Sequence, residues 1–424
     1  KIENLIKLLI MGQGFSFFIY VCFRLLIKPI MLFFYTFVRL SGGGTPSRAK
    51  KEYWEGDIAW YSSGELNDLY TKDPERHINE LAVNNSNAKL FPKGSLLIGM
   101  YDTAALKMSI IDREATFNQA IAGVKPNDKI DLKFILYSIN SIKSELLNLR
   151  RGVRQKNLSL EKIKKIPIPL PPLSEQKRIV SILDKAFAAI DKAKANAEQN
   201  LKNSKELFEN YLQTTFENGK LKIENGEWEE KRLGDICNII GGGTPSKKKD
   251  EFYNGDILWA TVRDMKSDTI KDTEHKITKD AVKNSSTNII PKNNVIIATR
   301  VGLGKVCLLQ DDTAINQDLK GIIPKNKKTL EVDFLFRWFK GNSKKIIDEG
   351  TGATVQGVKL PFIKSLVVYL PPLKEQQAIV KKLNALSAET KKLEAIYQQK
   401  IEDLEELKKS ILQKAFNGEL KVEN

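Results

Sequence analysis

Two glycine-rich segments carry the residue types best suited to holding an anion. The sequence GGGTPS occupies residues 42–47 and recurs at residues 241–246. Successive glycines let backbone N–H groups approach an anion, and Thr and Ser hydroxyls add further donors. Candidate phosphate contacts are therefore Gly43, Gly44, Thr45, Ser47, Arg48 and Lys50 in the first copy and Gly242, Gly243, Thr244, Ser246, Lys247 and Lys248 in the second. The same spacing also fits a purely structural turn, and the sequence leaves both interpretations open.

Other combinations that could support catalysis are weak. Residues 302–305 (GLGK) lack the spacing of a phosphate-binding P-loop. Residues 272–276 (DTEHK) place carboxylates near a lysine, but charged loops of this kind are common. The chain has only two histidines, His77 and His275, at unmatched positions. We therefore expect no catalytic residues, no metal and no cofactor.

Composition favours a polyanionic partner. The net charge is +16, with Lys and Arg together numbering 68. Residues 41–170 and residues 226–370 each carry a surplus of five positive charges, whereas residues 171–225 and 371–424 are nearly neutral. That distribution predicts two globular parts that contact phosphate groups. The three cysteines (Cys22, Cys237 and Cys307) form no CxxC pair, so the sequence indicates neither a disulfide framework nor a zinc site and favours a reducing, cytoplasmic compartment.

An internal repeat of about 200 residues decides the architecture. Beyond the glycine-rich segments, residues 170–176 (LPPLSEQ) match residues 370–376 (LPPLKEQ), and Asn118-Gln119 match Asn316-Gln317. Matches in one order at a constant offset indicate a duplicated unit, far longer than a solenoid repeat. Each copy has short apolar runs broken by Gly, Pro and Asn, which predict an α/β (α+β) globular domain. Within it, residues 132–149 and 332–347 have helical spacing.

Each copy ends in one long helix. Ser174 is the expected N-cap of the first, with Glu175 in its first turn. Both helices are predicted to stop at Asn-Gly pairs, residues 218–219 and 417–418. The predicted apolar stripes consist of Leu183, Phe187, Ile190, Ala197, Leu201, Phe208 and Tyr211, and of Ile379, Leu383, Leu386, Leu393, Tyr397, Leu404, Leu407 and Ile411. Because each stripe needs cover, we expect the helices to pair antiparallel as a coiled coil.

These expectations give a domain plan and a target geometry. The plan is target-recognition domains at residues 41–170 and 221–370, and spacer helices at residues 171–220 and 371–424. The domains form a pseudo-twofold repeat separated by two long antiparallel helices. A helix of about 44 residues is roughly 65 Å long, whereas DNA repeats about every 34 Å. The expected target is two unlike half-sites around an unread gap.

The chain resembles the specificity subunit of type I restriction–modification enzymes. The paired GGTPS loops, the two LPPLxEQ helix starts and the two Asn-Gly helix ends carry the resemblance, which covers residues 41–424. It implies a subunit without catalysis that binds double-stranded DNA, two S-adenosylmethionine-dependent methyltransferase (modification) subunits and ATP-dependent restriction subunits. LPPL is not a methyltransferase motif, because it lacks the polar first residue and the final aromatic that hold a flipped adenine. The alternatives are a stand-alone DNA-binding regulator and a coiled-coil scaffold that binds protein.

Residues that differ between the copies are the candidates for reading bases. Identical residues cannot distinguish unlike half-sites, so Trp60, Trp259 and the Asn-Gln pairs are expected to be framework. The candidate base readers are Tyr61, Ser62, Ser63, Glu65, Tyr101 and Asp102 in the first domain and Thr261, Arg263, Asp264, Thr299 and Arg300 in the second. Arg150, Arg151 and Arg154 form a basic cluster before the first long helix, fit either for phosphate or for solvent.

Residues 1–40 do not fit the repeat. Residues 8–23 lack charge but number only 16, and a spanning helix needs about 20. Three interpretations stay open: a membrane anchor, a rearranged or misread coding start, and an extra packed element. KIEN at residues 1–4 repeats at residues 222–225 and, as KVEN, at 421–424, which favours rearrangement. The first domain could then lack its own opening strand.

Overall fold

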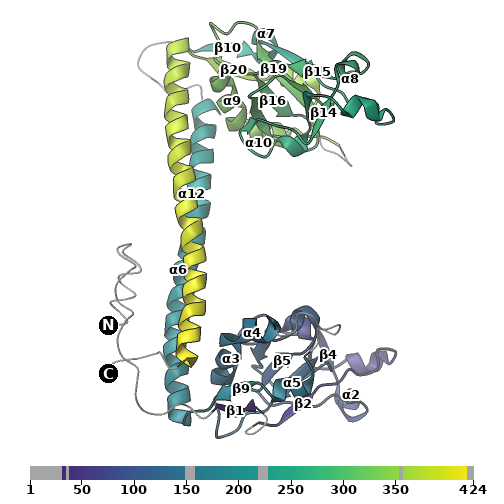
Figure 1. The fold of residues 1–424 in the computed structure, drawn as a ribbon, viewed down its shortest axis with the longest axis vertical. Coiled ribbons are helices and arrows are strands. Elements are labelled where there is room, and N and C mark those ends of the chain that lie inside the picture. Colours follow the sequence, from purple (N-terminus) through teal and green to yellow (C-terminus); the bar gives the residue numbers. More distant parts are fainter. Residues whose placement is uncertain (1–30, 35–37, 149–157, 218–227, 353–356, 418–424) are drawn as a thin grey trace. The chain divides into compact units, whose positions relative to one another are not determined.

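The fold consists of two compact units with the same topology. The computed structural model describes residues 31–34, 38–148, 158–217, 228–352 and 357–417 (Figure 1). Unit 1 comprises residues 1–197 and 399–424, and unit 2 comprises residues 198–398. Each unit holds one α/β region, the first part of one long helix and the last part of the other.

The described residues of unit 1 form three small sheets. Their strand orders are β1-β9, β2-β8-β5-β6 and β4-β3-β7, with β3 and β7 parallel and the other pairs antiparallel. The strands are β1 Met31–Phe33, β2 Leu40–Gly42, β3 Ile58–Tyr61, β4 Arg76–Ile78, β5 Leu96–Gly99, β6 Met108–Ile110, β7 Ala115–Phe117, β8 Ile121–Val124 and β9 Pro167–Pro169.

Unit 2 repeats this plan and adds two short strands. Its orders are β10-β20, β11-β19-β16-β17-β13 and β14-β12-β18-β15. The strands are β10 Glu229–Arg232, β11 Cys237–Gly241, β12 Ile257–Ala260, β13 Thr269–Ile270, β14 His275–Ile277, β15 Asn288–Ile290, β16 Val295–Ala298, β17 Val306–Leu309, β18 Thr313–Ile315, β19 Leu319–Pro324 and β20 Val367–Leu370. In unit 1, the positions that correspond to β13 and β15 form isolated β-bridges, between Tyr70 and Ile110 and between Phe91 and Ala115.

Short helices connect the strands in both units. Those of unit 1 are η2 Lys51–Trp54, η3 Ser63–Glu65, α2 Glu80–Asn84, η4 Asp102–Ala104, α3 Leu132–Ser141, α4 Lys143–Asn148 and α5 Leu160–Lys164. Those of unit 2 are α7 Leu233–Ile236, η5 Asp250–Tyr253, η6 Val262–Asp264, α8 Lys279–Lys283, α9 Val332–Gly341, α10 Ser343–Asp348 and α11 Leu360–Ser365. The two segments with helical spacing are therefore each split in two, as α3 with α4 and α9 with α10. The expected α/β repeat with long packed helices is confirmed.

The long helices α6 (Leu173–Glu217) and α12 (Leu373–Phe416) match the predicted length, with 45 and 44 residues. The predicted N-cap is wrong, because α6 already begins at Leu173 and Ser174 lies in its first turn. The carbonyl of Pro172 accepts hydrogen bonds from the amides of Glu175 and Gln176 there. Both helices end directly before the Asn-Gly pairs, of which only Asn417 lies among the described residues.

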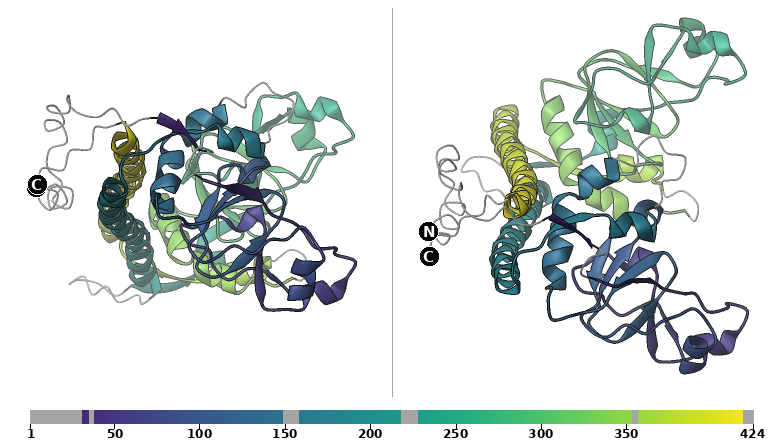
Figure 2. Two further views of the ribbon diagram at one scale, coloured as in Figure 1. Left: turned by 90° about the horizontal axis from the view of Figure 1, so that it is seen from below. Right: turned by 60° about the horizontal axis from the view of Figure 1, so that its bottom comes forward.

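Within each unit, α6 and α12 pack side by side (Figure 2), and the ion pairs between them run in opposite chain directions. In unit 1, Asp191 pairs with Lys408 and Lys194 with Glu405, each at 2.6 Å. Phe416, at the end of α12, packs on Phe134 of α3, with ring centroids 5.1 Å apart. In unit 2, Phe216 at the end of α6 packs on Phe334 of α9 at 5.5 Å. Each unit is therefore built from both repeats.

The predicted apolar stripe is partly wrong on α12. Leu386 and Leu393 are 36% and 44% exposed, whereas Ser387 is buried. The buried residues on α12 in unit 2 are Gln376, Ile379, Val380, Leu383 and Ser387, because a 3.6-residue period drifts away from a strict seven-residue spacing. On α6, Leu212 and Phe216 are buried, whereas the predicted stripe contained Tyr211 and neither of these two residues.

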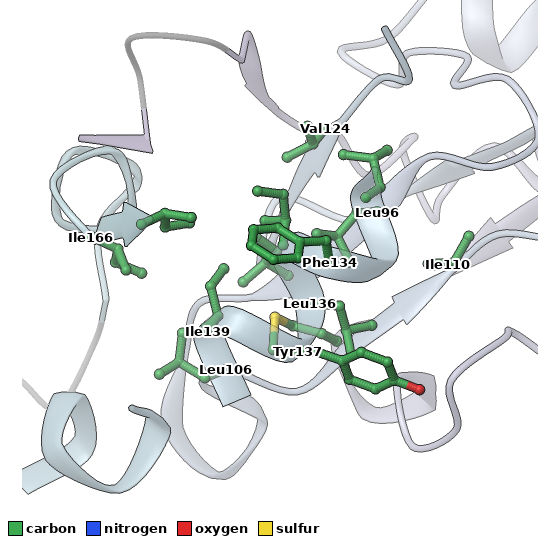
Figure 3. Packing of buried hydrophobic residues seen from close by; sticks show 14 of the residues in the cluster. Leu96, Leu106, Ile110, Val124, Phe134, Leu136, Tyr137, Ile139 and Ile166 are labelled. Atoms are coloured by element: carbon green, nitrogen blue, oxygen red, sulfur yellow. The ribbon is translucent and has the colours of Figure 1, made fainter. Parts of the chain in front are cut away.

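The core of unit 1 lies between α3 and the β2-β8-β5-β6 sheet. Phe134, Leu136 and Ile139 of α3 form one buried cluster with Leu96 and Val124 of the sheet, and Figure 3 shows Phe134 beside Leu96. Both long helices add to this cluster, through Leu183, Phe187 and Ile190 of α6 and Leu404 of α12. The core of unit 2 is equivalent, with α9 in place of α3.

A buried glutamine joins the start of each long helix to its domain. The Gln376 side chain is fully buried; its Oε1 accepts from the Glu331 amide, and its Nε2 donates to the Thr329 and Pro371 carbonyls, at 2.8–2.9 Å. Gln176 makes the equivalent three bonds with Asp131, Lys129 and Pro171 in unit 1. This explains the Gln of the repeated LPPLxEQ motif as a structural residue.

Part of the N-terminal segment belongs to the fold of unit 1. Strand β1 pairs with β9 as β10 pairs with β20, and β2 begins at Leu40, before the predicted domain boundary at residue 41. An opening strand is thus present in unit 1. Phe34 and Val38 are buried in the core. Residues 1–30 and 35–37, which bear on the three interpretations of this segment, lie outside the described residues. In the described part of the chain, none of the helices combines the length and the apolar character needed to cross a bilayer.

The N-termini of α3 and α9 differ in capping and give a stability prediction. Asp131 accepts hydrogen bonds from the Lys133 and Phe134 amides, at 2.9 and 3.0 Å. Glu331, its counterpart, makes no cap bond, and its Oε2 is buried without a partner among the described residues. Burial, with a smaller contribution from Asp333, raises the pKa of the Glu331 carboxyl.

Glu331→Asp should therefore stabilise the protein by about 0.5–1 kcal/mol, because the shorter side chain can cap α9 as Asp131 caps α3. Urea unfolding at pH 7 measures the effect, and Asp131→Glu is the matched control, expected to destabilise by a similar amount. An unchanged or lower unfolding midpoint for Glu331→Asp would show that the cap geometry does not transfer.

Candidate nucleic-acid interface

The glycine-rich segments are held as framework by backbone hydrogen bonds. The amides of Gly43 and Gly44 donate to the Ile121 and Phe117 carbonyls at 3.3 and 2.9 Å, and the Gly243 amide donates to Ile315 at 3.0 Å. A Cβ at Gly43 would overlap the Phe117 carbonyl oxygen, and one at Gly242 would overlap that of Ile315. The glycines are thus required for close backbone approach, and these three amides already have acceptors within the protein.

Residues shared by both copies lock these segments in place. The Thr45 and Thr244 hydroxyls donate to the side-chain oxygens of Gln119 and Gln317. The indole Nε1 of buried Trp60 donates to the Gly44 carbonyl at 3.0 Å, and that of Trp259 donates to Gly243 at 3.2 Å. The tryptophans are therefore framework residues, as the sequence indicated.

The exposed groups after each glycine-rich segment remain available to a polyanion. Ser47, Arg48 and Lys50 are exposed in unit 1, and Ser246, Lys247 and Lys248 are exposed in unit 2. The Lys50 ammonium donates to the Tyr53 hydroxyl at 2.9 Å, and this hydrogen bond raises the pKa of Lys50.

Strand ends gather beside these segments and form what we call the strand-end face. In unit 2 it comprises residues 261–264 after β12, Arg300 after β16, and residues 316–320 after β18. The Asn316 amide donates to the Ala260 carbonyl at 3.0 Å and the Thr299 amide to Asp318 at 2.8 Å, which holds the three strand ends together. Gly302, just beyond Arg300, lies against Val262 of η6.

The strand-end face of unit 1 has the same frame. It comprises residues 62–65, Tyr101 and residues 118–122. The Asn118 amide donates to the Tyr61 carbonyl at 3.0 Å and the Met100 amide to Ala120 at 2.9 Å, matching the two bonds of unit 2. Positions therefore correspond one to one between the two faces.

Two predicted base readers are wrong. Tyr61 is 1% exposed, and its hydroxyl donates to the Lys72 carbonyl at 2.8 Å. Thr299 is 3% exposed, and its hydroxyl donates to the Asp318 carbonyl at 3.2 Å. Tyr61 is the last residue of β3, and Thr299 directly follows β16. Both side chains point into the packed interior.

Four further candidates differ in type but perform the same structural task. Ser62 with Glu65, and Thr261 with Asp264, form capping boxes around η3 and η6. Glu65 also accepts from the Glu75 amide and Asp264 from the Glu274 amide, at 2.9 and 2.8 Å. A difference between copies therefore does not by itself mark a base reader. Ser63, inside η3, is half-buried.

The exposed candidates on the strand-end face are Tyr101, Arg263 and Arg300. Tyr101 is 38% exposed. The Arg300 side chain is 53% exposed, and its Nη1 lies 3.5 Å from Oδ1 of Asp318. The Asp102 side chain, Arg150, Arg151 and Arg154 lie outside the described residues.

Sequence reasoning missed two charged residues of this face. Asp318 binds Arg300, and Lys320 is half-buried beside them, so that burial lowers the pKa of Lys320 while Asp318 opposes the shift. Their counterparts in unit 1 are Ala120 and Ala122. Both positions differ between the copies, and this is the signal in the sequence that could have marked them.

Comparison with known proteins decides the family. The model of the type I restriction modification DNA specificity domain matches twice, at residues 37–202 and 225–403. The chain belongs to this family. Membership confirms the resemblance seen in the sequence, and with it a non-catalytic specificity subunit that determines DNA target recognition.

Curated relatives agree with this assignment. The chain is 34% identical to the specificity subunit of type I restriction enzyme EcoR124I/EcoR124II of Escherichia coli over 61% of this chain and 64% of that relative. That match therefore spans less than two thirds of the relative's length. Similarity to the MjaIX specificity subunit of Methanocaldococcus jannaschii is 25% identity over 91% of each chain.

Solved structures share the fold. A chain from a structure on complex assembly and conformational transition of the type I R-M system superposes with a TM-score of 0.72 at 17% identity, covering 90% of this chain and 98% of that one. The HsdS subunit from Thermoanaerobacter tengcongensis gives a TM-score of 0.58 at 17% identity, covering 90% and 97%.

Proposed function

We propose that this specificity subunit reads a split, asymmetric target in double-stranded DNA, one half-site with each unit. The observation that carries the proposal is the duplicated strand-end face. Its frame is the same in both units, whereas its exposed residues differ, with Tyr101 in unit 1 and Arg263 and Arg300 in unit 2. A constant frame with variable exposed residues suits two readers of unlike sequences.

Phosphate contacts would come from the cations beside each face. Arg48 and Lys50 in unit 1, and Lys247 and Lys248 in unit 2, follow the glycine-rich segments and are exposed. They would hold the duplex in register without reading its sequence. The glycines and the Thr45 and Thr244 hydroxyls position these cations.

The partners follow from the family rather than from this chain's geometry. The names of the curated relatives describe subunits of restriction enzymes, and we propose that this chain likewise joins methyltransferase and restriction subunits. Two methyltransferase subunits per chain and a cytoplasmic location are part of the proposal. Cys237 and Cys307, both buried and unpaired, are compatible with a reducing compartment.

Methylome sequencing tests the proposed function. Host DNA should contain one split motif, methylated on both strands, that disappears when the gene is deleted and returns when it is restored. The purified chain should bind duplex DNA with an affinity that falls steeply with salt. Survival of every split motif in the deletion strain would overturn the proposal. Sequence-specific binding without any methyltransferase partner would indicate a stand-alone regulator, and no salt-dependent DNA binding would indicate a scaffold.

A further inference from the structure

The two strand-end faces differ in charge at corresponding positions. Arg263, Arg300 and Lys320 in unit 2 correspond to Gly64, Tyr101 and Ala122 in unit 1. The correspondence rests on paired hydrogen bonds and strand registers: Ile297 pairs with Lys320 as Ile98 pairs with Ala122, and the Thr299 and Met100 amides bind matching carbonyls. At these three positions unit 2 carries cations and unit 1 carries none, and unit 2 also has the carboxylate of Asp318 where unit 1 has Ala120.

Arg300 is the arginine of this set whose side chain has an ion-pair partner in the structure. Asp318 lies 3.5 Å from its Nη1, and the counterpart of Asp318 is Ala120, in the unit that has no arginine there. Asp318 is therefore present in the unit that carries the arginine with which it pairs, and absent from the corresponding position of the other unit. Gly357 lies near the stem of this side chain, because a Cβ added at the glycine would be 3.2 Å from the Arg300 Cγ. The remaining guanidinium donors stay exposed.

Arg263 lies on the neighbouring turn of the same face. It is exposed at the second position of η6, and the capping box of Thr261 and Asp264 fixes the backbone of that turn. Contact of Gly302 with Val262 brings the η6 turn and the loop after Arg300 together. The two arginines can therefore approach the same groove.

We infer that Arg300, oriented by Asp318 and assisted by Arg263, reads guanine in the half-site bound by unit 2. This rests on the proposed function. An oriented guanidinium donates two parallel hydrogen bonds to O6 and N7 of guanine, a pattern that no other base offers in the major groove. The half-site of unit 1 is read at the corresponding position by Tyr101, without an arginine. The target is therefore asymmetric in a defined way: the half-site bound by unit 2 requires a G·C pair at the position that Arg300 contacts.

The test combines methylomes with binding by the full chain in its assembled complex. Strains carrying the wild-type chain, Arg300→Ala, Arg263→Ala or Tyr101→Ala are sequenced for methylated motifs. Fluorescence anisotropy then measures affinity for duplexes in which each G·C pair of either half-site is replaced singly. Lys374→Ala, which removes an exposed cation at the start of α12, is the matched charge control. Circular dichroism confirms that each variant is folded.

Arg300→Ala should relax the motif at one G·C position of one half-site. Discrimination at that position should fall by about 10- to 100-fold, the range of a bidentate arginine–guanine contact. Tyr101→Ala should alter only the other half-site, and Lys374→Ala should alter neither. Equal weakening on all duplexes would identify Arg300 as a phosphate contact and overturn the inference. An unchanged motif in both arginine variants would also overturn the inference about Arg300. If that unchanged motif is still split, the proposed function remains intact.

Discussion

Replacing Gly43 by alanine should destabilise unit 1 by about 3 kcal/mol or more. The added Cβ would overlap the Phe117 carbonyl oxygen and lie 2.6 Å from that of Asn118. Both obstacles are backbone atoms, at the last residue of β7 and at the first residue of its connection to β8. Gly242→Ala should act in the same way in unit 2, because its Cβ would overlap the Ile315 and Asn316 carbonyl oxygens.

The neighbouring glycines supply the control for this prediction. A Cβ at Gly42 would meet nothing within 4 Å, and one at Gly241 would meet only the Lys320 side chain, at 3.8 Å or more. Gly42→Ala and Gly241→Ala should therefore change the free energy of unfolding by less than about 0.5 kcal/mol. Hydrogen exchange resolved by peptide measures the loss in β7 and β8. If β7 and β8 are equally protected from hydrogen exchange in Gly42→Ala and Gly43→Ala, the glycines are not required for packing.

Gln376→Ala is expected to destabilise unit 2 by about 2–4 kcal/mol. The substitution removes a buried side chain and leaves the Glu331 amide and the Thr329 and Pro371 carbonyls without their partner. Gln176→Ala should have the same effect in unit 1. The cost is high because these bonds connect the long helix to the first turn of the helix that forms the domain core.

Gln377, next in the chain and exposed, is the matched control. Gln377→Ala has the same helix-propensity change but removes none of these bonds, so it should change stability by less than about 0.5 kcal/mol. Urea unfolding followed by tryptophan fluorescence compares the two variants. If both unfold at the wild-type urea concentration, the buried glutamine contributes no net stability.

The repeat predicted the architecture because duplication places the same signals at a constant offset. Two α/β domains, two helices of about 44 residues and their antiparallel packing all followed from it. The apolar stripe failed at Leu386 and Leu393, because the seam follows the real helical period and accommodates Ser387 instead. Opening strand β1 was missed because Met31–Phe33 bear no likeness to Glu229–Arg232, and strand pairing uses backbone groups that the side-chain pattern does not reveal.

The candidate site was predicted less well for a similar reason. The comparison of copies correctly separated framework residues such as Trp60 and Trp259 from variable ones. It could not show that Tyr61 and Thr299 point inward, or that Glu65 and Asp264 cap the same turn. Conversely, the ion pair of Arg300 with Asp318 joins residues distant in the sequence, so only the folded strand ends reveal it.

Each unit is expected to read its own half-site on a duplicated frame. The most direct measurement is the affinity of the assembled complex for four duplexes at one salt concentration: intact, scrambled in either half-site, and scrambled in the gap. We predict that each scrambled half-site weakens binding separately, whereas the scrambled gap binds as tightly as the intact target. Loss of binding with the scrambled gap, or no loss with one scrambled half-site, would contradict the claim.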